Sequence, residues 1–389
     1  NLNWESTESF TVPPEASAHL RLATERGQAK QDEWHTALGE YRKVFPDEAQ
    51  QLEDALLGRL PANWEDGLNG LFEKAEPIAT RSASGVVMNA ISKGLPSLIG
   101  GSADLAPSTR TSLDGRGDIG PGEFSGHNLH FGVREHAMGA VANGMALHGG
   151  AIPYTATFLV FSDYMRPSIR LGALMGQQVI YVFTHDSIGV GEDGPTHQPI
   201  EHLMSLREIP GLVVCRPADA TETVEVWRAA IARREGPTVM AFTRQNLPVL
   251  DRTELAPATG ALKGGYTLWE SSNSPEMIII ATGSEVHIAL EAGQRLASDG
   301  IATRVVSMPS CELFDEQPKD YREQVLPSSI KARVSVEAGS IKGWERYVGL
   351  DGASVGMSSY GASAPAGVLY DKFGITADRV AEEARKLVE

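Results

Sequence analysis

The sequence has only two cysteines, Cys215 and Cys311, among its 389 residues, which excludes a fold stabilised by several disulfides. No apolar run approaches the ~18 residues that a membrane-spanning helix needs, and no signal-peptide pattern opens the chain. From these absences we expect a reducing, cytoplasmic setting and no membrane partner.

Positive charge is also scarce, because 34 Lys and Arg residues stand against 50 Asp and Glu residues, for a net charge of −16. Such an acidic protein repels nucleic acid, so no nucleic-acid partner is expected, although a local basic patch can still bind a small phosphorylated substrate. The chain has no Gly-x-x-x-x-Gly-Lys-Ser/Thr loop, and its two Gly-x-Gly-x-x-Gly matches, at 115–120 and 189–194, neither directly follow a predicted strand nor open a predicted helix, as the dinucleotide-binding fingerprint requires. Nucleotide hydrolases and simple nicotinamide enzymes are therefore disfavoured.

Residues 1–76 differ from the rest of the chain because they hold fifteen acidic and seven basic residues and no long apolar strand. Three helices are predicted at 15–30, 31–43 and 46–59, with Pro13-Pro14, Pro46 and Pro61 as breaks. The segment is typical of a helical linker that lies on the surface of another body.

Short apolar strands and amphipathic helices alternate in the next part of the chain, 77–250. This alternation predicts a mostly parallel sheet with helices on both faces. The predicted strands are 98–101, 178–184, 212–216 and 238–243, and the predicted helices are 82–93, 134–148, 157–175 and 221–234.

After a polar stretch at 251–263, the same alternation restarts in residues 264–389. The overall prediction is two consecutive α/β domains with mostly parallel sheets, preceded by a helical segment. In the second domain we expect strands at 277–282, 303–307, 332–336 and 353–356, and helices at 285–298 and 376–388.

Glu135 lies at the start of a predicted helix, within Gly-Val-Arg-Glu-His-Ala-Met. One interpretation is partial burial among small and apolar neighbours, which favours the neutral acid. The other is an acidic residue that the positive end of the helix dipole stabilises. The spacing alone leaves both open.

Residues 184–199 hold two histidines, three acidic residues and three glycines directly after a buried strand. Ligands of open α/β sheets bind at the carboxyl ends of strands, so this density favours a functional loop. Metal binding, sugar binding and a plain polar turn are the three interpretations.

The remaining candidate site residues are two aromatic residues and three possible anion contacts. Phe161 and Tyr164 share one helix face and either stack on a flat heterocycle or pack in the core. Arg81, Ser108 and Arg244 are candidate phosphate contacts, and surface ion pairs are the alternative for the arginines.

Several segments, in their order along the chain, resemble the transketolase family of thiamine-diphosphate enzymes. The resemblance implies a pyrimidine-binding domain at 77–250, a transketolase C-terminal domain at 264–389 and, at 1–76, a linker from an N-terminal domain. The segments are GGSADLAPS, FGVREHAMGAVANG, YTATFLVFSDYMR, THDSIGVGEDGPTHQP, IIATGSEV and VVSMPS.

The resemblance also implies roles for single residues. Glu135 matches the glutamate that hydrogen-bonds N1′ of the cofactor's aminopyrimidine, and Phe161 and Tyr164 match the aromatic pair on that ring. His197 resembles a residue that hydrogen-bonds substrate oxygens, and Asp193 resembles the carboxylate that recognises the C2 hydroxyl. The implied substrate-phosphate clamp is His185, Arg81, Ser108 and Arg244.

The family's diphosphate- and metal-binding domain carries a Gly-Asp-Gly motif, which this sequence lacks. Ligands for Mg²⁺ or Ca²⁺ are therefore expected from that other domain and none is assigned here. A truncated enzyme, a split enzyme with a separate subunit and a non-catalytic relic are the three accounts.

By resemblance, the reaction is transfer of a two-carbon ketol unit from a ketose phosphate such as xylulose 5-phosphate to an aldose phosphate such as ribose 5-phosphate. A homodimer is implied in the same way, with the C-terminal domain supporting it. A dihydroxyacetone synthase-like enzyme and a dimeric scaffold without catalysis are the alternatives.

Overall fold

The computed structural model describes residues 8–73 and 76–389. The chain divides into two compact units, residues 1–59 and 60–389, which are treated separately below. None of the helices within the described ranges is both long and apolar enough to cross a membrane.

The first unit consists of two helices, α1 (Pro14–Val44) and α2 (Pro46–Leu56). Each begins with a proline in its first turn, where the missing N–H is tolerated. The predicted break between 30 and 31 is wrong, because one helix runs through both segments. The two glycines inside it, Gly27 and Gly39, cost about 1 kcal/mol each, which is too little to end a helix of this length.

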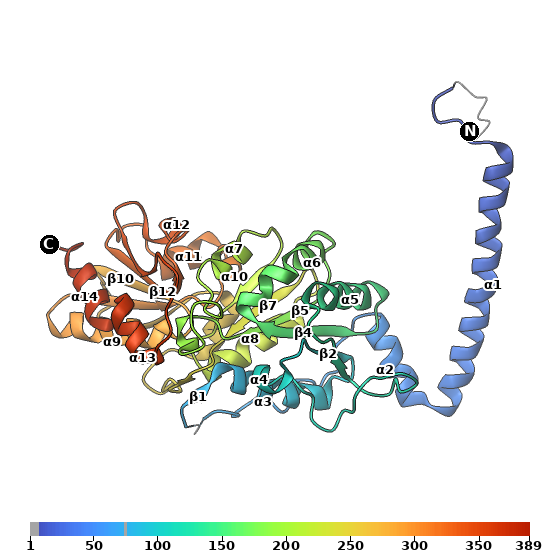
Figure 1. The fold of residues 1–389 in the computed structure, drawn as a ribbon, viewed down its shortest axis with the longest axis horizontal. Coiled ribbons are helices and arrows are strands. Elements are labelled where there is room, and N and C mark those ends of the chain that lie inside the picture. The colour runs from blue at the N-terminus through green and yellow to red at the C-terminus, as the bar shows by residue number, and fades with distance from the viewer. Residues whose placement is uncertain (1–7, 74–75) are drawn as a thin grey trace. The chain divides into compact units, whose positions relative to one another are not determined.

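The second unit begins with an α/β domain around a six-stranded sheet (Figure 1). The strand order is β3-β2-β4-β5-β7-β6, and every neighbouring pair is parallel. β1 (Ile78–Ala79) and β8 (Asn246–Leu247) form a separate antiparallel pair. The six strands are β2 (Leu98–Ser102), β3 (Asn128–His130), β4 (Ile152–Phe158), β5 (Ile180–Thr184), β6 (Val213–Cys215) and β7 (Thr238–Phe242).

Both faces of this sheet are buried, as the alternation along β5 shows. Ile180 and Val182 belong to one hydrophobic core, and Tyr181 and Phe183 belong to another. Figure 1 shows α5 and α6 on one side of β4, β5 and β7 and α3 on the other. The helices are α3 (Thr80–Gly94) and α8 (Ala220–Ala232) in the first core, α5 (Glu135–His148), α6 (Ser162–Leu174) and α7 (His202–Arg207) in the second, and the short α4 (Ala106–Thr109).

The predicted helix at 157–175 is wrong in its first part. β4 continues to Phe158, a 3₁₀ turn covers Leu159–Phe161, and only then does α6 begin at Ser162. Every residue of β4 is buried, so the strand lacks the polar alternation that distinguishes a strand from a buried helix. The change of structure at Phe158 places Phe161 at a strand-to-helix junction.

The second α/β domain has a five-stranded sheet with the order β13-β12-β10-β11-β9. Only β9 is antiparallel to its neighbour, and as an edge strand with three partly exposed residues it gave no clear sequence signal. The strands are β9 (Tyr266–Glu270), β10 (Met277–Ala281), β11 (Thr303–Ser307), β12 (Arg333–Ser340) and β13 (Ala353–Met357).

Two cores cover the faces of this second sheet. Ile279 packs with side chains of α9, α13 and α14, and Ile280 packs with side chains of α10, α11 and α12. The predicted two-domain α/β architecture is therefore confirmed. The helices are α9 (Glu285–Ser298), α10 (Cys311–Asp315), α11 (Lys319–Val325), α12 (Glu345–Val348), α13 (Ala366–Phe373) and α14 (Ala377–Arg385).

Candidate functional site

The predicted site residues follow the carboxyl ends of neighbouring parallel strands. Ser108 comes after β2, Phe161 after β4, His185 directly after β5 and Arg244 after β7. Because the carboxyl ends of parallel strands meet at one edge of a sheet, the fold brings these segments together. This is the edge at which open α/β sheets bind their ligands.

A cavity of about 780 Å³ contains all three predicted cofactor residues, Glu135, Phe161 and Tyr164. The Phe161 and Tyr164 rings lie 6.1 Å apart, and Tyr164 is 66% exposed, so this pair is not core packing. Glu135 begins α5 and is half-buried, and no described residue forms a hydrogen bond or ion pair with its carboxylate. The remaining lining residues are Asp104, Leu105, Val133, Arg134, His136 and Ala137.

A series of aromatic contacts connects this cavity to the two predicted histidines. The Phe161 ring lies 5.7 Å from the His197 ring and 5.8 Å from the Phe158 ring, measured between centroids. Phe158 in turn stacks on His185 at 3.6 Å. His185 and His197 therefore lie beside the cavity that holds Glu135.

His185 is buried and adopts a left-handed backbone conformation, with φ of 61°. Burial, together with the nearby charges of Arg81, Arg244 and His197, lowers the pKa of His185 to about 3. Its imidazole is therefore neutral at pH 7. The hydroxyl of Thr184 lies 2.8 Å from Nδ1 of this ring.

Arginines gather around His185 without acidic partners. Burial and the charges of Arg244 and Arg110 lower the pKa of Arg81, so these three side chains lie near one another. Arg81 donates from Nη1 to the backbone oxygen of Ser108 at 2.7 Å, and no carboxylate within residues 8–73 and 76–389 pairs with any of the three. The sequence analysis missed Arg110, because its proximity arises from the fold.

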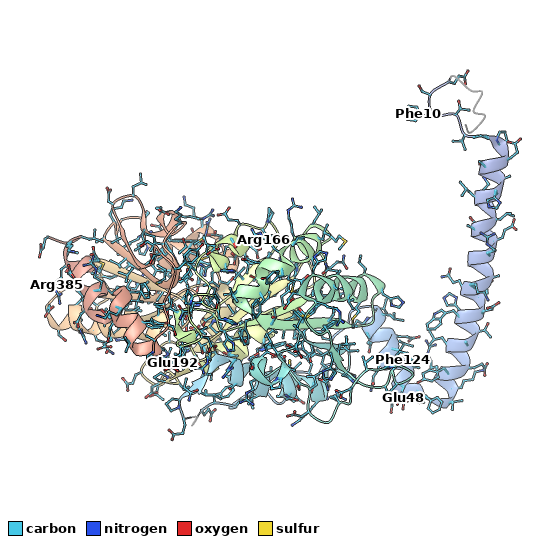
Figure 2. All side chains as sticks on the ribbon, in the orientation of Figure 1. Phe10, Glu48, Phe124, Arg166, Glu192 and Arg385 are labelled. Atoms are coloured by element: carbon cyan, nitrogen blue, oxygen red, sulfur yellow. The ribbon has the colours of Figure 1, made fainter. Side chains whose placement is uncertain are left out.

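Asp193 lies on the loop between His185 and Gln198, on which Figure 2 labels the neighbouring Glu192. Its side chain is exposed, and none of its described contacts joins it to the other predicted residues. The structure thus brings Glu135, Phe161, Tyr164, His185 and His197 together with the arginines, and no described contact joins Asp193 to them.

Three possible metal ligands lie together elsewhere, Asp163, Glu201 and His202. Nε2 of the buried His202 is 3.1 Å from the Asp163 carboxylate, and Nδ1 is 3.9 Å from the Glu201 carboxylate. Both carboxylates are about 60% exposed, and Nε2 of His202 is already hydrogen-bonded to Asp163, so the group is explained as a surface ion pair. We assign no metal to this group.

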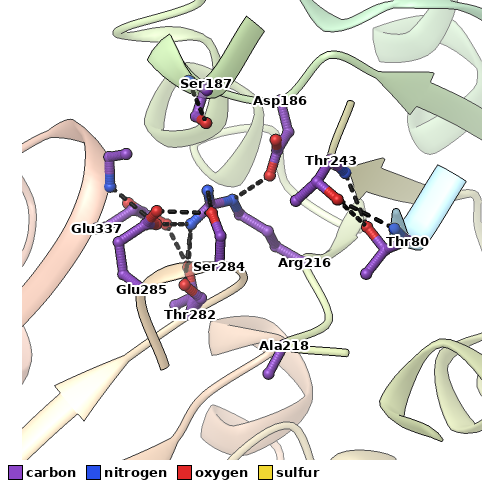
Figure 3. Close-up of polar contacts among 12 residues, drawn as sticks. Thr80, Asp186, Ser187, Arg216, Ala218, Thr243, Thr282, Ser284, Glu285 and Glu337 are labelled. Carbon is purple, nitrogen blue, oxygen red and sulfur yellow. Dashed lines mark hydrogen bonds and ion pairs between the residues drawn. The ribbon is translucent and has the colours of Figure 1, made fainter. Parts of the chain in front are cut away.

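A buried ionic network, which the sequence analysis also missed, joins the two α/β domains (Figure 3). Arg216 donates from Nε to Asp186 at 2.8 Å and forms an ion pair with Glu285, and all three side chains are at most 1% exposed. It also donates to the backbone oxygen of Thr282 at 2.9 Å. Burial raises the pKa of Asp186, and the charge of Arg216 opposes this effect.

Glu337, on β12 of the second domain, extends the network to Arg207 on α7 of the first domain. It accepts two hydrogen bonds from Arg207, at 2.8 and 2.9 Å, and one from Thr282 at 2.8 Å. Burial alone would raise the pKa of Glu337, but the charges of Arg207 and Arg216 hold it at about 2. No local sequence pattern announces this group, because its members come from five separate segments.

Three family models match consecutive parts of the chain. The model described as transketolase, pyrimidine binding domain, matches 76–249, and the transketolase-like TK C-terminal domain matches 264–376. Residues 1–61 match the model of the transketolase thiamine diphosphate binding domain. The fold and the matched models place the chain in the class of proteins built from thiamine-diphosphate-binding domains of the transketolase type.

Curated relatives narrow this class to one family. The chain is 49% identical over 376 residues to a transketolase of Aquifex aeolicus, covering 97% of this chain and 54% of the relative. It is 48% identical over 391 residues to a chloroplastic transketolase of Craterostigma plantagineum, covering 100% of this chain and 75% of the relative. The chain therefore belongs to the transketolase family, and it spans about half the length of most of these relatives.

Solved structures of transketolases also match the fold of this chain. A transketolase of Pichia stipitis, in complex with sedoheptulose 7-phosphate, superposes with a TM-score of 0.92 at 40% identity, covering 98% of this chain and 56% of that one. A structure described as a split-gene transketolase, an inactive β4 tetramer, superposes with a TM-score of 0.64 at 26% identity. That match covers 80% of this chain and 98% of that one.

Proposed function

We propose that this chain supplies the pyrimidine-binding and C-terminal domains of a transketolase. The reaction is transfer of a two-carbon ketol unit from a ketose phosphate to an aldose phosphate, with thiamine diphosphate as cofactor. The observation that supports this most is the gathering of Glu135, Phe161 and Tyr164 on one cavity beside His185 and His197.

The cavity residues fit the flat pyrimidine ring of the cofactor. Phe161 and Tyr164 offer aromatic faces for packing, and the Glu135 carboxylate, with no partner among the described residues, is available to hydrogen-bond a ring nitrogen. When bound, thiamine diphosphate supplies an acidic carbon that becomes the nucleophile toward the ketose carbonyl. Glu135 holds a proton at the pyrimidine N1′ and so acts as the acid–base partner of that ring.

The polar groups beside the cavity suit a sugar phosphate. Arg81 and Arg244 provide positive charge without acidic partners, and the neutral His185 imidazole donates or accepts one hydrogen bond. Ser108 completes this clamp, His197 hydrogen-bonds substrate oxygens, and Asp193 recognises the hydroxyl on C2. The sedoheptulose 7-phosphate bound to the Pichia stipitis relative supports this class of substrate.

We further propose that Mg²⁺ or Ca²⁺ is held by the remainder of the diphosphate-binding domain, of which residues 1–61 match only a fragment, since the Gly-Asp-Gly motif is absent. That domain is carried by a separate subunit or by a longer form of the chain, and the split-gene neighbour supports the first arrangement. Exposed apolar side chains on α5 and α6, Val141, Leu147, Leu171 and Leu174, support a homodimer. The two cysteines are buried free thiols, which suits a cytoplasmic location.

A dimeric scaffold without catalysis is the second candidate, and the missing metal motif is the observation in its favour. Calorimetry separates the two proposals. We expect thiamine diphosphate with Mg²⁺ to bind when a diphosphate-binding domain is added, and Glu135→Gln to weaken that binding. If thiamine diphosphate bound the original chain and the Glu135→Gln variant with the same affinity, the proposed contact of Glu135 with the cofactor would be rejected.

The decisive test is turnover. The chain, mixed with the diphosphate-binding domain of a relative, is expected to form glyceraldehyde 3-phosphate from xylulose 5-phosphate and ribose 5-phosphate in a coupled assay. Replacing ribose 5-phosphate with formaldehyde distinguishes a dihydroxyacetone synthase-like enzyme. No turnover with either acceptor, although cofactor binds the mixture, would reject both enzyme assignments.

A further inference from the structure

The loop at 185–198, which carries His185, Asp193 and His197, is anchored at its start to the second α/β domain. Asp186, the second residue after the strand β5, contacts Arg216, whose guanidinium also binds Glu285 and the backbone oxygen of Thr282. Figure 3 shows Arg216 between Asp186 on one side and the second domain's residues on the other. The loop therefore begins at a buried ionic contact with another domain.

A second anchor involves α13. The hydroxyl of Tyr370 donates to Oε1 of Glu285 at 2.7 Å and lies 3.4 Å from the hydroxyl of Ser187. Ser187 is fully buried and also accepts a hydrogen bond from the backbone N–H of Gly189. The residues on the carboxyl side of His185 are thus held by α13 as well as by Arg216.

The far end of the loop is held by the segment before α13. Nε2 of Gln198 donates to the backbone oxygens of Gly191, within the loop, and Ala362, in the second domain, at 2.8 and 2.9 Å. The hydroxyl of Ser363 donates to the backbone oxygen of Glu192 at 2.5 Å, and Figure 2 shows Glu192 next to the second domain. A Cβ at position 361 would lie 1.8 Å from Oε1 of Gln198, so any other residue there would force the Gln198 side chain to move.

The conformation of His185 needs such anchors. Its φ of 61° is unfavourable for a residue with a Cβ, and such a conformation persists only where the surroundings impose it. On one side the Phe158 ring stacks on the imidazole, and on the other Asp186 is tied to Arg216. The pyrimidine-binding domain alone supplies only part of this constraint.

We propose that the C-terminal domain positions the 185–198 loop, so that residues 361–370 and the Arg216 contacts determine where His185 and His197 lie. The C-terminal domain thereby contributes to substrate binding without touching substrate. The inference rests on the proposed function only for the nature of the ligand, a sugar phosphate.

Gly361→Ala, with Gly367→Ala as its matched control, tests this in the full chain. Gly361→Ala displaces Gln198, whereas a Cβ at Gly367 in α13 meets nothing within 4 Å. By hydrogen exchange we expect the amides of 186–198 to exchange about tenfold faster in Gly361→Ala. By calorimetry we expect about tenfold weaker binding of ribose 5-phosphate, with Gly367→Ala unchanged in both.

Tyr370→Phe, which removes only the hydroxyl, is the second variant in case Gly361→Ala does not fold. We expect it to speed up hydrogen exchange at the amides of 186–198 as well, by a smaller factor. The proposal would be overturned if, in both variants, the amides of 186–198 exchanged at the rate of the original chain and ribose 5-phosphate bound with the same affinity, even if the thermal stability of the variants fell. If the original chain, mixed with the diphosphate-binding domain of a relative, does not bind ribose 5-phosphate, the proposed function fails, and the exchange measurement on the chain still tests the positioning.

Discussion

Two polar regions lie on either side of His185, and they differ in how their charges are paired. In the domain interface, Arg216 and Arg207 are at most 4% exposed and each is paired with a carboxylate that is at most 1% exposed. At the sheet edge, Arg81, Arg110 and Arg244 have no carboxylate partner among the described residues, and neither a donor nor a cation pairs with Glu135.

The difference separates groups that serve the fold from groups available to a ligand. A buried charge is tolerated only when it is paired and hydrogen-bonded, so the interface residues are explained by contacts within the chain. Unpaired charges of one sign that gather at a ligand-binding edge are not explained in this way. Consecutive residues fall into different groups, since His185 faces the arginines and Asp186 faces Arg216.

The strongest test of the ligand-binding side is Glu135→Gln in the enzyme reconstituted with its diphosphate-binding domain. Loss of an acid–base group predicts hydrogen–deuterium exchange at the cofactor's C2 that is slower by about 10²–10⁴-fold. Urea unfolding of the chain should change by no more than about 0.5 kcal/mol, because the carboxylate has no partner in the fold. Glu254→Gln, an exposed carboxylate in the polar stretch between the domains, is the control. Unchanged exchange would remove Glu135 from the reaction.

The interface side predicts the opposite pattern for Arg216→Met. Removing one partner leaves the Asp186 and Glu285 carboxylates buried without their cation, so the free energy of unfolding should fall by about 3–5 kcal/mol. Arg385→Met, which removes a surface pair with Asp299, should cost no more than about 1 kcal/mol. If urea denaturation showed the same loss of unfolding free energy for Arg216→Met and Arg385→Met, the distinction between buried, paired charges and surface charges would be contradicted.

A third test uses pH on the same network. The pKa of Glu337 is about 2 in the folded chain, below the usual value of 4.5, so its stabilisation is present above pH 4.5 and is lost as pH falls toward 2. The shift corresponds to about 3 kcal/mol. Glu337→Gln should therefore lose less unfolding free energy than the original chain between pH 5 and pH 2. If the free energy of unfolding fell by the same amount with pH in the original chain and in Glu337→Gln, the pairing of Glu337 with Arg207 would be contradicted.

The smallest expected effect is on substrate affinity. Arg81→Gln removes a charged donor worth about 1.5–3 kcal/mol, so the KM for a phosphorylated acceptor should rise by about 10- to 100-fold. The KM for an acceptor without phosphate should not change, and Arg346→Gln, far along the chain on α12, is the charge-matched control. If the KM rose equally for the acceptors with and without phosphate, Arg81 would not bind the phosphate group.

The regular elements were the part of the fold that the sequence predicted well. The helices at Glu135–His148, Ala220–Ala232 and Glu285–Ser298 lie within two residues of their predicted ranges. The errors fall where periodicity carries no information. β4 is buried on both faces, and the predicted helix at 157–175 wrongly includes its last two residues, while residues 152–156 and the edge strand β9 have no predicted element.

The candidate site was predicted residue by residue through the family resemblance, and its assembly came from the fold. The sequence gives no reason for Phe161 to meet His197, or for Arg110 to approach Arg81. These contacts arise because four strands of one parallel sheet end at the same edge. The roles of the site residues remain predictions that the experiments above test.

By itself, the sequence determined the alternation of strands and helices and the residue types at the sheet edge, because propensity and periodicity act over about ten residues. Only the tertiary structure decided which charges are paired. Arg216 and Glu285 are 69 positions apart, so their contact has no local signature. Burial then makes that pairing obligatory, since a lone charge inside the protein costs far more than one in water.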